Sequence, residues 1–129
     1  MVQYLPAEEI LLMHAQLVEA TGGGHGVRDL NLFLTIVAKP EQSFGGKERF
    51  PTVWEKAAVL FDGFARHQVF TDGNKRTGAA AAARFLHVNG YALNASNEEL
   101  EQLALDIAAK KIGIKKVARQ LQRLSTAQR

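Results

Sequence analysis

Residues 70–90 read Phe-Thr-Asp-Gly-Asn-Lys-Arg-Thr-Gly-Ala-Ala-Ala-Ala-Ala-Arg-Phe-Leu-His-Val-Asn-Gly, and the two halves of this stretch differ. The first half is polar and contains the turn-forming pair Asp72-Gly73, whereas residues 78–83 are only glycine and alanine. We therefore expect a loop that passes into a helix over residues 74–88, which Asn89-Gly90 ends. Because the start of that helix has almost no side-chain volume, other elements can approach it closely, and we expect it at the centre of the fold.

Apolar residues recur at helical spacing on both sides of this stretch. Each run is bounded by recognisable signals, such as a proline followed by acidic residues, a run of glycines, or the capping box that starts at Ser96. The expected helices begin near Pro6, Leu30, Pro51, Asn74, Ser96 and Ile114. The sequence thus predicts an all-α fold, a bundle of about six helices in a single domain over residues 1–129.

Residues 39–50 break the helical pattern. They read Lys-Pro-Glu-Gln-Ser-Phe-Gly-Gly-Lys-Glu-Arg-Phe, with a Gly-Gly pair between two short arms that each carry an aromatic residue. Glycine pairs between such arms are typical of tight turns. This segment therefore predicts a loop or a small β-hairpin between the second and third helices.

Composition narrows the classes of protein to which the chain can belong. Hydrophobic residues make up 47% and charged residues 22%, as in folded soluble domains, and cysteine is absent. The chain therefore has no disulfide and no thiolate metal site. It has no apolar run of about 18 residues and no signal peptide at its start, so we expect a cytoplasmic protein without a membrane span.

The net charge of +3 is modest, and much of the basic excess lies towards the C-terminus. Such an excess fits nucleic acid, a phosphate ligand or an acidic protein partner. No recognition-helix pattern accompanies it, so the sequence does not favour a nucleic-acid binder.

The loop before the alanine-rich helix carries the residues with the clearest chemistry. Amide groups at a helix start are unpaired and favour anions. Gly73 lets a ligand approach the backbone, Asn74 adds amide donors, and Lys75 and Arg76 add two positive charges. Asp72 is suited to Mg²⁺ carried by a phosphate. These five residues therefore predict a site for a nucleotide with Mg²⁺.

The same residues are also compatible with a purely structural turn. In that alternative Asp72 caps the helix, Gly73 and Asn74 form the turn, and Lys75 and Arg76 face water.

Several stretches together support a resemblance that covers nearly the whole chain. The most specific is Phe-Thr-Asp-Gly-Asn-Lys-Arg-Thr at residues 70–77. The others are Tyr-Leu-Pro-Ala-Glu-Glu at 4–9, Gly-Val-Arg-Asp-Leu at 26–30, Ala-Lys-Pro-Glu-Gln-Ser-Phe-Gly-Gly at 38–46, Phe-Pro-Thr at 50–52 and Phe-Leu-His-Val-Asn-Gly-Tyr at 85–91. The chain resembles the Doc (death-on-curing) toxins of the Fic/Doc superfamily, whose motif reads His-x-Phe-x-Asp/Asn-Gly/Ala-Asn-Lys-Arg.

The resemblance implies the Fic fold, a helical bundle with the motif in the loop before a central helix. It implies that Asp72 holds Mg²⁺, that residues 73–76 hold the phosphates of ATP, and that Phe70 anchors the loop in the core. It also implies that residues 39–50 form a flap beside the site, which positions a target chain by strand pairing.

The resemblance further implies an activity and partners. Doc toxins transfer the γ-phosphate of ATP to a threonine of elongation factor Tu, which blocks translation. Their antitoxins use a C-terminal segment that folds as a helix in an apolar groove of the toxin. Most other Fic proteins transfer AMP; they have a glycine after the motif asparagine and a second arginine further along. Lys75 and Ala79 stand at these positions, which matches the Doc branch and leaves AMP transfer as an alternative.

One position departs from the Doc motif. Gln68 stands where the family has the catalytic histidine, and His67 lies one residue too early. The implied catalytic set is Gln68, Asp72, Lys75 and Arg76. Because the amide of Gln68 lacks a basic nitrogen, we expect weak or absent catalysis. The chain is then an inactivated toxin, a natural pseudoenzyme that serves as a binding module for nucleotide or antitoxin, or an enzyme in which His67 takes over as base.

Overall fold

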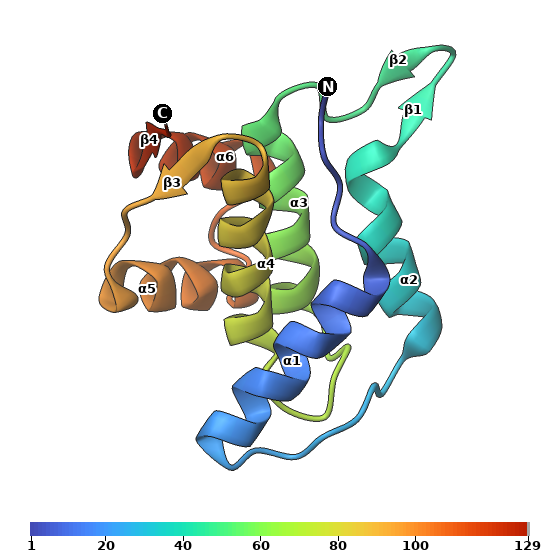
Figure 1. Ribbon diagram of the computed structural model, residues 1–129, viewed down its shortest axis with the longest axis vertical. Coiled ribbons are helices and arrows are strands. Elements are labelled where there is room, and N and C mark those ends of the chain that lie inside the picture. Colours follow the sequence, from blue (N-terminus) through green and yellow to red (C-terminus); the bar gives the residue numbers. More distant parts are fainter. Residues whose placement is uncertain (129) are drawn as a thin grey trace.

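The computed structural model describes residues 1–128, in which six α-helices are joined by short connections and two small strand pairs (Figure 1). The helices are α1 (Ala7–Thr21), α2 (Leu30–Ala38), α3 (Val53–Arg66), α4 (Asn74–Val88), α5 (Asn97–Ala108) and α6 (Ile114–Arg123). The strands are β1 (Ser43–Phe44), β2 (Lys47–Glu48), β3 (Tyr91–Leu93) and β4 (Ser125–Ala127), and a 3-10 turn covers Lys39–Glu41. The predicted helical bundle with a hairpin in residues 39–50 is confirmed.

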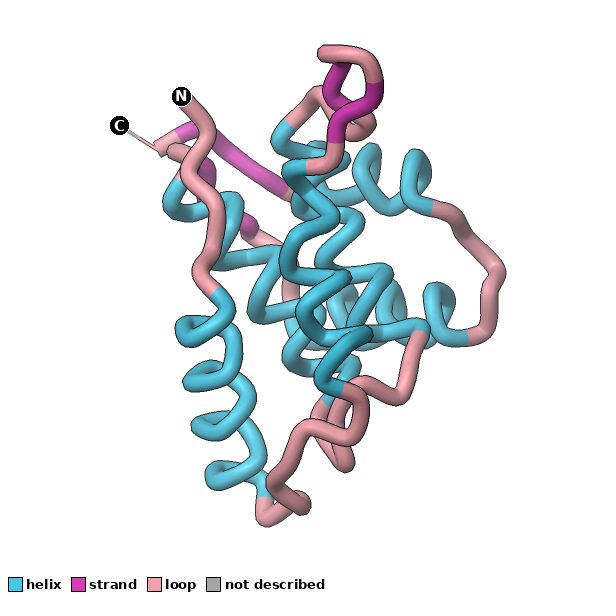
Figure 2. The backbone as a smooth tube through the Cα atoms, turned by 90° about the vertical axis from the view of Figure 1, so that its right-hand side faces the viewer, coloured by secondary structure: helices cyan, strands magenta, loops and turns pink. Residues whose placement is uncertain are grey.

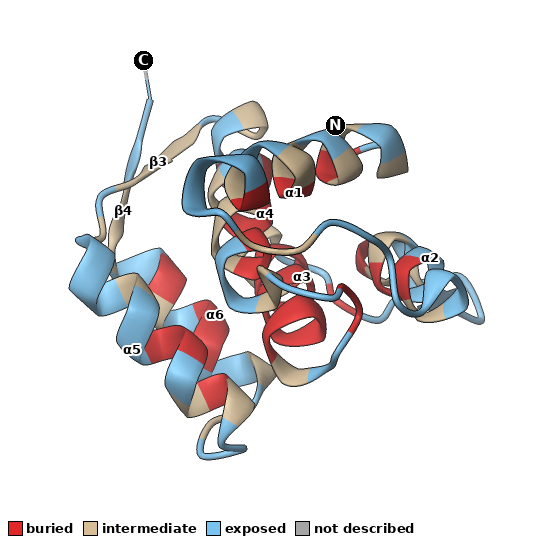
Figure 3. Cartoon of the chain, turned by 90° about the horizontal axis from the view of Figure 1, so that it is seen from below, coloured by how far each residue is buried: buried red, intermediate tan, exposed pale blue. Residues whose placement is uncertain are grey.

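The helix at the centre of the fold is α3, with α2, α4, α5 and α6 packed around it (Figure 3). Every residue of α3 from Lys56 to Ala65 is buried. The alanine-rich α4 also lies within the bundle, as expected, because it packs against α1, α3 and α5, although Arg84 is exposed. Small side chains allow close approach but bury little apolar area, and large side chains of α3 such as Phe61 and Phe64 supply that area.

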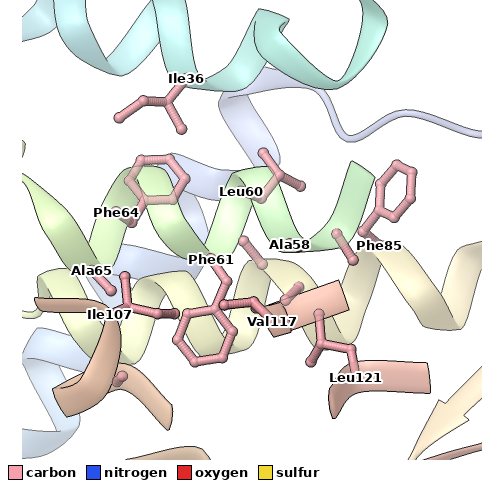
Figure 4. Packing of buried hydrophobic residues seen from close by; sticks show 14 of the residues in the cluster. Ile36, Ala58, Leu60, Phe61, Phe64, Ala65, Phe85, Ile107, Val117 and Leu121 are labelled. Atoms are coloured by element: carbon pink, nitrogen blue, oxygen red, sulfur yellow. The ribbon is translucent and has the colours of Figure 1, made fainter. Parts of the chain in front are cut away.

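Two glycines allow α3 to lie close to its neighbours. At Gly63 of α3, an added Cβ would lie 2.5 Å from Cγ2 of Ile36 in α2. At Gly78 of α4, an added Cβ would lie 3.0 Å from the carbonyl oxygen of Phe61. In Figure 4, Ile36 lies over Phe64 on one side of α3, while Phe61 points away on the other. Any side chain at these two positions would therefore push α2 or α4 away from the core.

Side-chain caps set the start of α2, α3 and α5, and at α2 the Asp29 carboxylate accepts from the N–H of Leu32. At α5 the predicted capping box is present: the Ser96 hydroxyl accepts from the Glu99 N–H, and the Glu99 carboxylate accepts from the Ser96 N–H. Two hydrogen bonds with Ser96 lower the pKa of Glu99 from its ordinary value of 4.5. The larger effect comes from the Ser96 backbone and the smaller one from the Ser96 side chain. α3 begins after Thr52 rather than at Pro51, because the Thr52 hydroxyl accepts from the N–H of Glu55.

The hairpin of β1 and β2 is fastened to the N-terminal end of α3 by one buried side chain. The ammonium of Lys56 donates to the carbonyl oxygens of Pro40 and Phe50, at 3.2 and 2.6 Å. It also donates to the carboxylate of Glu48, at 2.9 Å. Because a lysine ammonium has three protons, all of its donors are satisfied. Lys56 thus holds both ends of the segment that contains the hairpin.

The hairpin does not lie beside residues 72–76, contrary to what the family resemblance implied. Figures 1 and 2 place the hairpin at one end of α3 and the loop over residues 67–73 at the other. At a rise of 1.5 Å per residue, the 14 residues of α3 separate its two ends by about 21 Å. The hairpin precedes α3 and the loop follows it, so the length of the helix keeps the two apart.

A second pair of strands, β3 and β4, was not expected from the sequence. β3 follows Gly90, whose φ of 95° turns the chain out of α4, and it pairs antiparallel with β4. Strands of three residues are too short to show an alternating pattern. Within residues 1–128, no helix is both long and apolar enough to cross a membrane.

Candidate functional site

The loop over residues 67–73, here called the motif loop, joins α3 to α4 and forms one wall of an open cleft of about 450 Å³. The residues that line the cleft are Thr21, Gly23, Ala65, Gln68, Thr71, Asp72, Gly73, Asn74, Lys75 and Arg76. All the site residues predicted from the sequence, Gln68 and Asp72 to Arg76, are therefore brought together. His67 is not among the lining residues; it is exposed and ends α3.

The cleft opens onto the start of α4. The first bond of this helix runs from the N–H of Thr77 to the carbonyl oxygen of Gly73, at 2.9 Å. The amides of residues 73–76 therefore have no acceptor in the helix, and none elsewhere in residues 1–128. Gly73 has a φ of 80°, which favours glycine, and an added Cβ would lie 3.1 Å from Val18 of α1. Four amides without a partner in residues 1–128 are thus available to an anion at this helix start.

The side chain of Asn74 closes the motif loop on itself. Its Oδ1 accepts from the backbone N–H of Phe70 at 2.9 Å, and its Nδ2 donates to the Phe70 carbonyl at 3.0 Å. From the sequence we predicted that the Asn74 amide binds phosphates. In the structure its oxygen and one of its two N–H hydrogens are instead bonded to the backbone of Phe70. Phe70 itself is fully buried, as predicted, between the aromatic rings of His14, Phe33 and Phe64.

Asp72 does not cap α4, so the purely structural alternative is wrong for this residue. Its Oδ2 accepts from the backbone N–H of Gly24, at 2.7 Å, in the glycine run that follows α1. The run comes so close that an added Cβ on Gly24 would lie 3.0 Å from that oxygen. The sequence indicated this run only as the end of a helix, although three consecutive glycines were a signal for close backbone approach.

The charges at the cleft are exposed and unpaired. Lys75 and Arg76 are both exposed on the first turn of α4, and neither forms an ion pair among residues 1–128. Over the same residues no group of three or more acidic, histidine or cysteine side chains could hold a metal ion alone. A divalent cation at Asp72 would therefore need further oxygen ligands from water or from an anion, as Mg²⁺ on a nucleotide has.

Comparison with known proteins identifies the family. Residues 4–86 match the Fic/DOC family, and this range includes the whole of the cleft. The chain belongs to the Fic/DOC family. It is also 37% identical over 123 residues to a protein named Toxin Doc from Mycolicibacterium smegmatis, and the match covers 94% of this chain and 92% of that relative.

In this Fic/DOC domain an exposed backbone edge lies next to the cleft. Val27 forms an isolated antiparallel bridge with Phe70 of the motif loop. The hydrogen bonds of the bridge join the residues on either side of this pair, so the N–H and C=O of Val27 itself point outwards. Neither group has a partner in residues 1–128, and the Val27 side chain is exposed. The N–H and C=O of Phe70, on the other side of the bridge, are bonded to the side chain of Asn74. The open backbone edge is therefore on the Val27 side.

Proposed function

We propose that this chain is a toxin of a toxin–antitoxin module and that it binds ATP with Mg²⁺ in the cleft at residues 72–76. The observation that carries the proposal is the set of groups around this one opening: one carboxylate, with four amides and two cations that have no partner in residues 1–128. The name of the relative, Toxin Doc, supports the toxin function. The AMP-transferring branch has glycine and arginine at the positions of Lys75 and Ala79. This difference supports the transfer of phosphate, rather than of AMP, in the lineage of this chain.

The residues of the cleft fit a triphosphate that carries Mg²⁺. Asp72 keeps its Oδ1 without a hydrogen bond in residues 1–128, and one carboxylate oxygen is a usual protein ligand for Mg²⁺ on phosphates. Bound Mg²⁺ would neutralise charge on the phosphate oxygens. The amides of residues 73–76 bind phosphate oxygens where the helix dipole also favours negative charge. Lys75 and Arg76 add two cations, which raise the affinity for a triphosphate over that for a single phosphate.

The transfer step explains why Gln68 matters. A threonine hydroxyl of the target attacks the γ-phosphorus, the bond from that phosphorus to the bridging oxygen breaks, and ADP leaves. The hydroxyl proton must pass to a base. Gln68 lines the cleft at the motif position of the histidine, but an amide does not take up a proton near neutral pH. We therefore expect transfer that is slower by about 10²–10⁴-fold than with histidine.

The deciding experiment is the substitution Gln68→His, assayed with purified elongation factor Tu and with ATP labelled on either the α- or the γ-phosphate. We expect γ-label on a threonine with the variant, and little or none with the original chain. Transfer of α-label would show an AMP transferase instead. If neither label is transferred although ATP binds, the chain is a binding module. His67→Gln in the Gln68→His background is the control, and it should leave the rate unchanged.

We propose that the target chain docks along the Val27 edge rather than on the hairpin. Family resemblance implies strand pairing with the target, and such pairing needs unpaired backbone groups near the reacting atoms. Val27 offers one N–H and one C=O beside the motif loop, whereas the hairpin lies at the opposite end of α3.

Two substitutions in the Gln68→His background separate the docking edges. Val27→Pro removes the outward N–H, and we expect the KM for elongation factor Tu to rise about tenfold while the affinity for ATP stays the same. Phe44→Ala, on the exposed hairpin, should change neither. A KM that responds to Phe44→Ala and not to Val27→Pro would assign docking to the hairpin.

The binding-module alternative is favoured by Gln68 alone, because nucleotide binding needs no base. Calorimetry with ATP and Mg²⁺ on the original chain, beside the transfer assay, separates this alternative from the enzyme. An antitoxin partner is proposed on the same family grounds. A short gene immediately upstream whose product restores growth of cells that express Gln68→His would support it, and growth arrest that the product leaves unchanged would contradict it.

A further inference from the structure

His14 is a buried histidine that contacts the motif loop, and the proposed function does not use it. It lies on the inner face of α1 with only 4% of its surface exposed. Its ring stacks on Phe70 with ring centroids 3.8 Å apart and an angle of 12° between the rings. Its Nε2 lies 2.8 Å from the carbonyl oxygen of Asp72. Because a carbonyl oxygen only accepts, Nε2 carries the proton and donates it.

This bond determines the direction of the next amide. The peptide between Asp72 and Gly73 is trans, so its C=O and N–H point in opposite directions. The carbonyl points towards His14 in the interior, and the Gly73 N–H therefore points away from α1, on the cleft side. Gly73 has no side chain that would restrain the rotation of this peptide plane. Within residues 1–128, the bond from His14 is the only hydrogen bond that this peptide group forms.

We infer that His14 is a positioning residue that aims the Gly73 amide at the phosphate group bound in the cleft. The inference rests on the proposed binding of ATP with Mg²⁺. His14 touches neither the nucleotide nor the target and acts only through the peptide plane between Asp72 and Gly73. The ring of Phe70, whose backbone is bonded to Asn74, stacks on one face of the His14 ring.

Two substitutions of the same length separate the hydrogen bond from packing. His14→Gln keeps a donor at the end of the side chain, His14→Met has none, and both lose the aromatic stack. We expect both variants to lose similar thermal stability. His14→Gln should bind ATP with Mg²⁺ within about threefold of the original chain, whereas His14→Met should bind at least tenfold more weakly. Inorganic triphosphate with Mg²⁺ should give the same difference, because the inferred contact of the Gly73 amide is with a phosphate group.

A measurement on the original chain keeps the test valid if His14→Met does not fold. When inorganic triphosphate and Mg²⁺ are added to ¹⁵N-labelled protein, the Gly73 amide resonance should move at least as far as those of residues 74–76. Equal binding by the two variants, or a Gly73 resonance that stays in place while those of 74–76 move, overturns the role of His14 and leaves the proposed function intact. Failure of the original chain to bind ATP or triphosphate overturns both.

Discussion

The two ends of α3 are built in opposite ways. At the N-terminal end, the ammonium of Lys56 is buried and all three of its protons are bonded, so the hairpin is fixed in one place. At the C-terminal end, Lys75 and Arg76 are exposed without ion pairs in residues 1–128, and four amides are unpaired. Saturated polar groups determine shape, whereas unsaturated groups at an open cleft are available to a ligand. Substitutions at the first end should therefore change stability, and substitutions at the second end should change ligand binding.

The largest effect is expected at the saturated end. Lys56→Met removes the donor for two carbonyl oxygens and leaves Glu48 without its partner, so the free energy of unfolding should fall by about 3 kcal/mol. Urea denaturation measures this loss, and the folded fraction should bind ATP with Mg²⁺ as before. Lys47→Met on the exposed face of the hairpin is the control and should change stability by less than about 0.5 kcal/mol. A stable Lys56→Met protein would remove the contrast between the ends.

The second prediction concerns the side chain that closes the motif loop. Asn74→Ala leaves the N–H and C=O of Phe70 unpaired, and the free energy of unfolding should fall by about 2 kcal/mol. The affinity for ATP should also decrease, because the loop orients the helix start. Asn94→Ala, which removes an exposed bond to Thr126, is the comparison and should have little effect on either quantity. Unchanged stability of Asn74→Ala would show that the loop is held by its backbone pairing alone.

At the unsaturated end, stability and binding should separate. The double substitution Lys75→Ala with Arg76→Ala should change the free energy of unfolding by less than about 0.5 kcal/mol, because neither side chain has a partner in residues 1–128. The Kd for ATP with Mg²⁺ should rise at least tenfold, and the difference should shrink as salt is added. Lys115→Ala on α6 should leave the Kd unchanged. Calorimetry at two salt concentrations measures the Kd and its dependence on salt. A loss of stability without a loss of binding would mean that Lys75 and Arg76 are structural residues rather than ligand-binding ones.

The smallest effect lies away from both ends, at the start of α5. The pKa of Glu99 is lower in the folded chain than its ordinary value of 4.5, first because of the bond from the Ser96 backbone. Its contribution to stability is therefore present above pH 4.5 and is lost as the pH falls through the lowered pKa. Unfolding measured from neutral to acidic pH should show this loss, and Glu99→Gln should remove it from the pH profile. An identical profile for Glu99→Gln would mean that the capping box contributes no pH dependence.

The content of the cleft was predictable because most of it is contiguous in sequence. A loop followed at once by a helix places Asp72 to Arg76 around one helix start, whatever the rest of the fold. The parts that were missed come from α1 and the residues after it: Gly24 and Val27 reach the motif loop through backbone atoms, and His14 reaches a backbone carbonyl of the loop through its ring. Backbone contacts of this kind leave no residue pattern beyond a glycine run.

The position of the hairpin shows a second limit of sequence reasoning. Residues 39–50 were correctly predicted as a hairpin, because the Gly-Gly pair and its flanking arms are local signals. Their distance from the cleft depends on the length of α3 and on the direction in which the chain enters it. The central position of α3 was missed for a related reason, since burial depends on which neighbours supply apolar area.

The close approach at Gly63 has a consequence for the evolution of this domain. An added Cβ there would overlap the branched side chain of Ile36, which belongs to a different helix. Position 63 is therefore open to alanine only if position 36 becomes smaller at the same time. We expect natural relatives to show paired changes at these two positions, with glycine retained wherever a β-branched residue faces it.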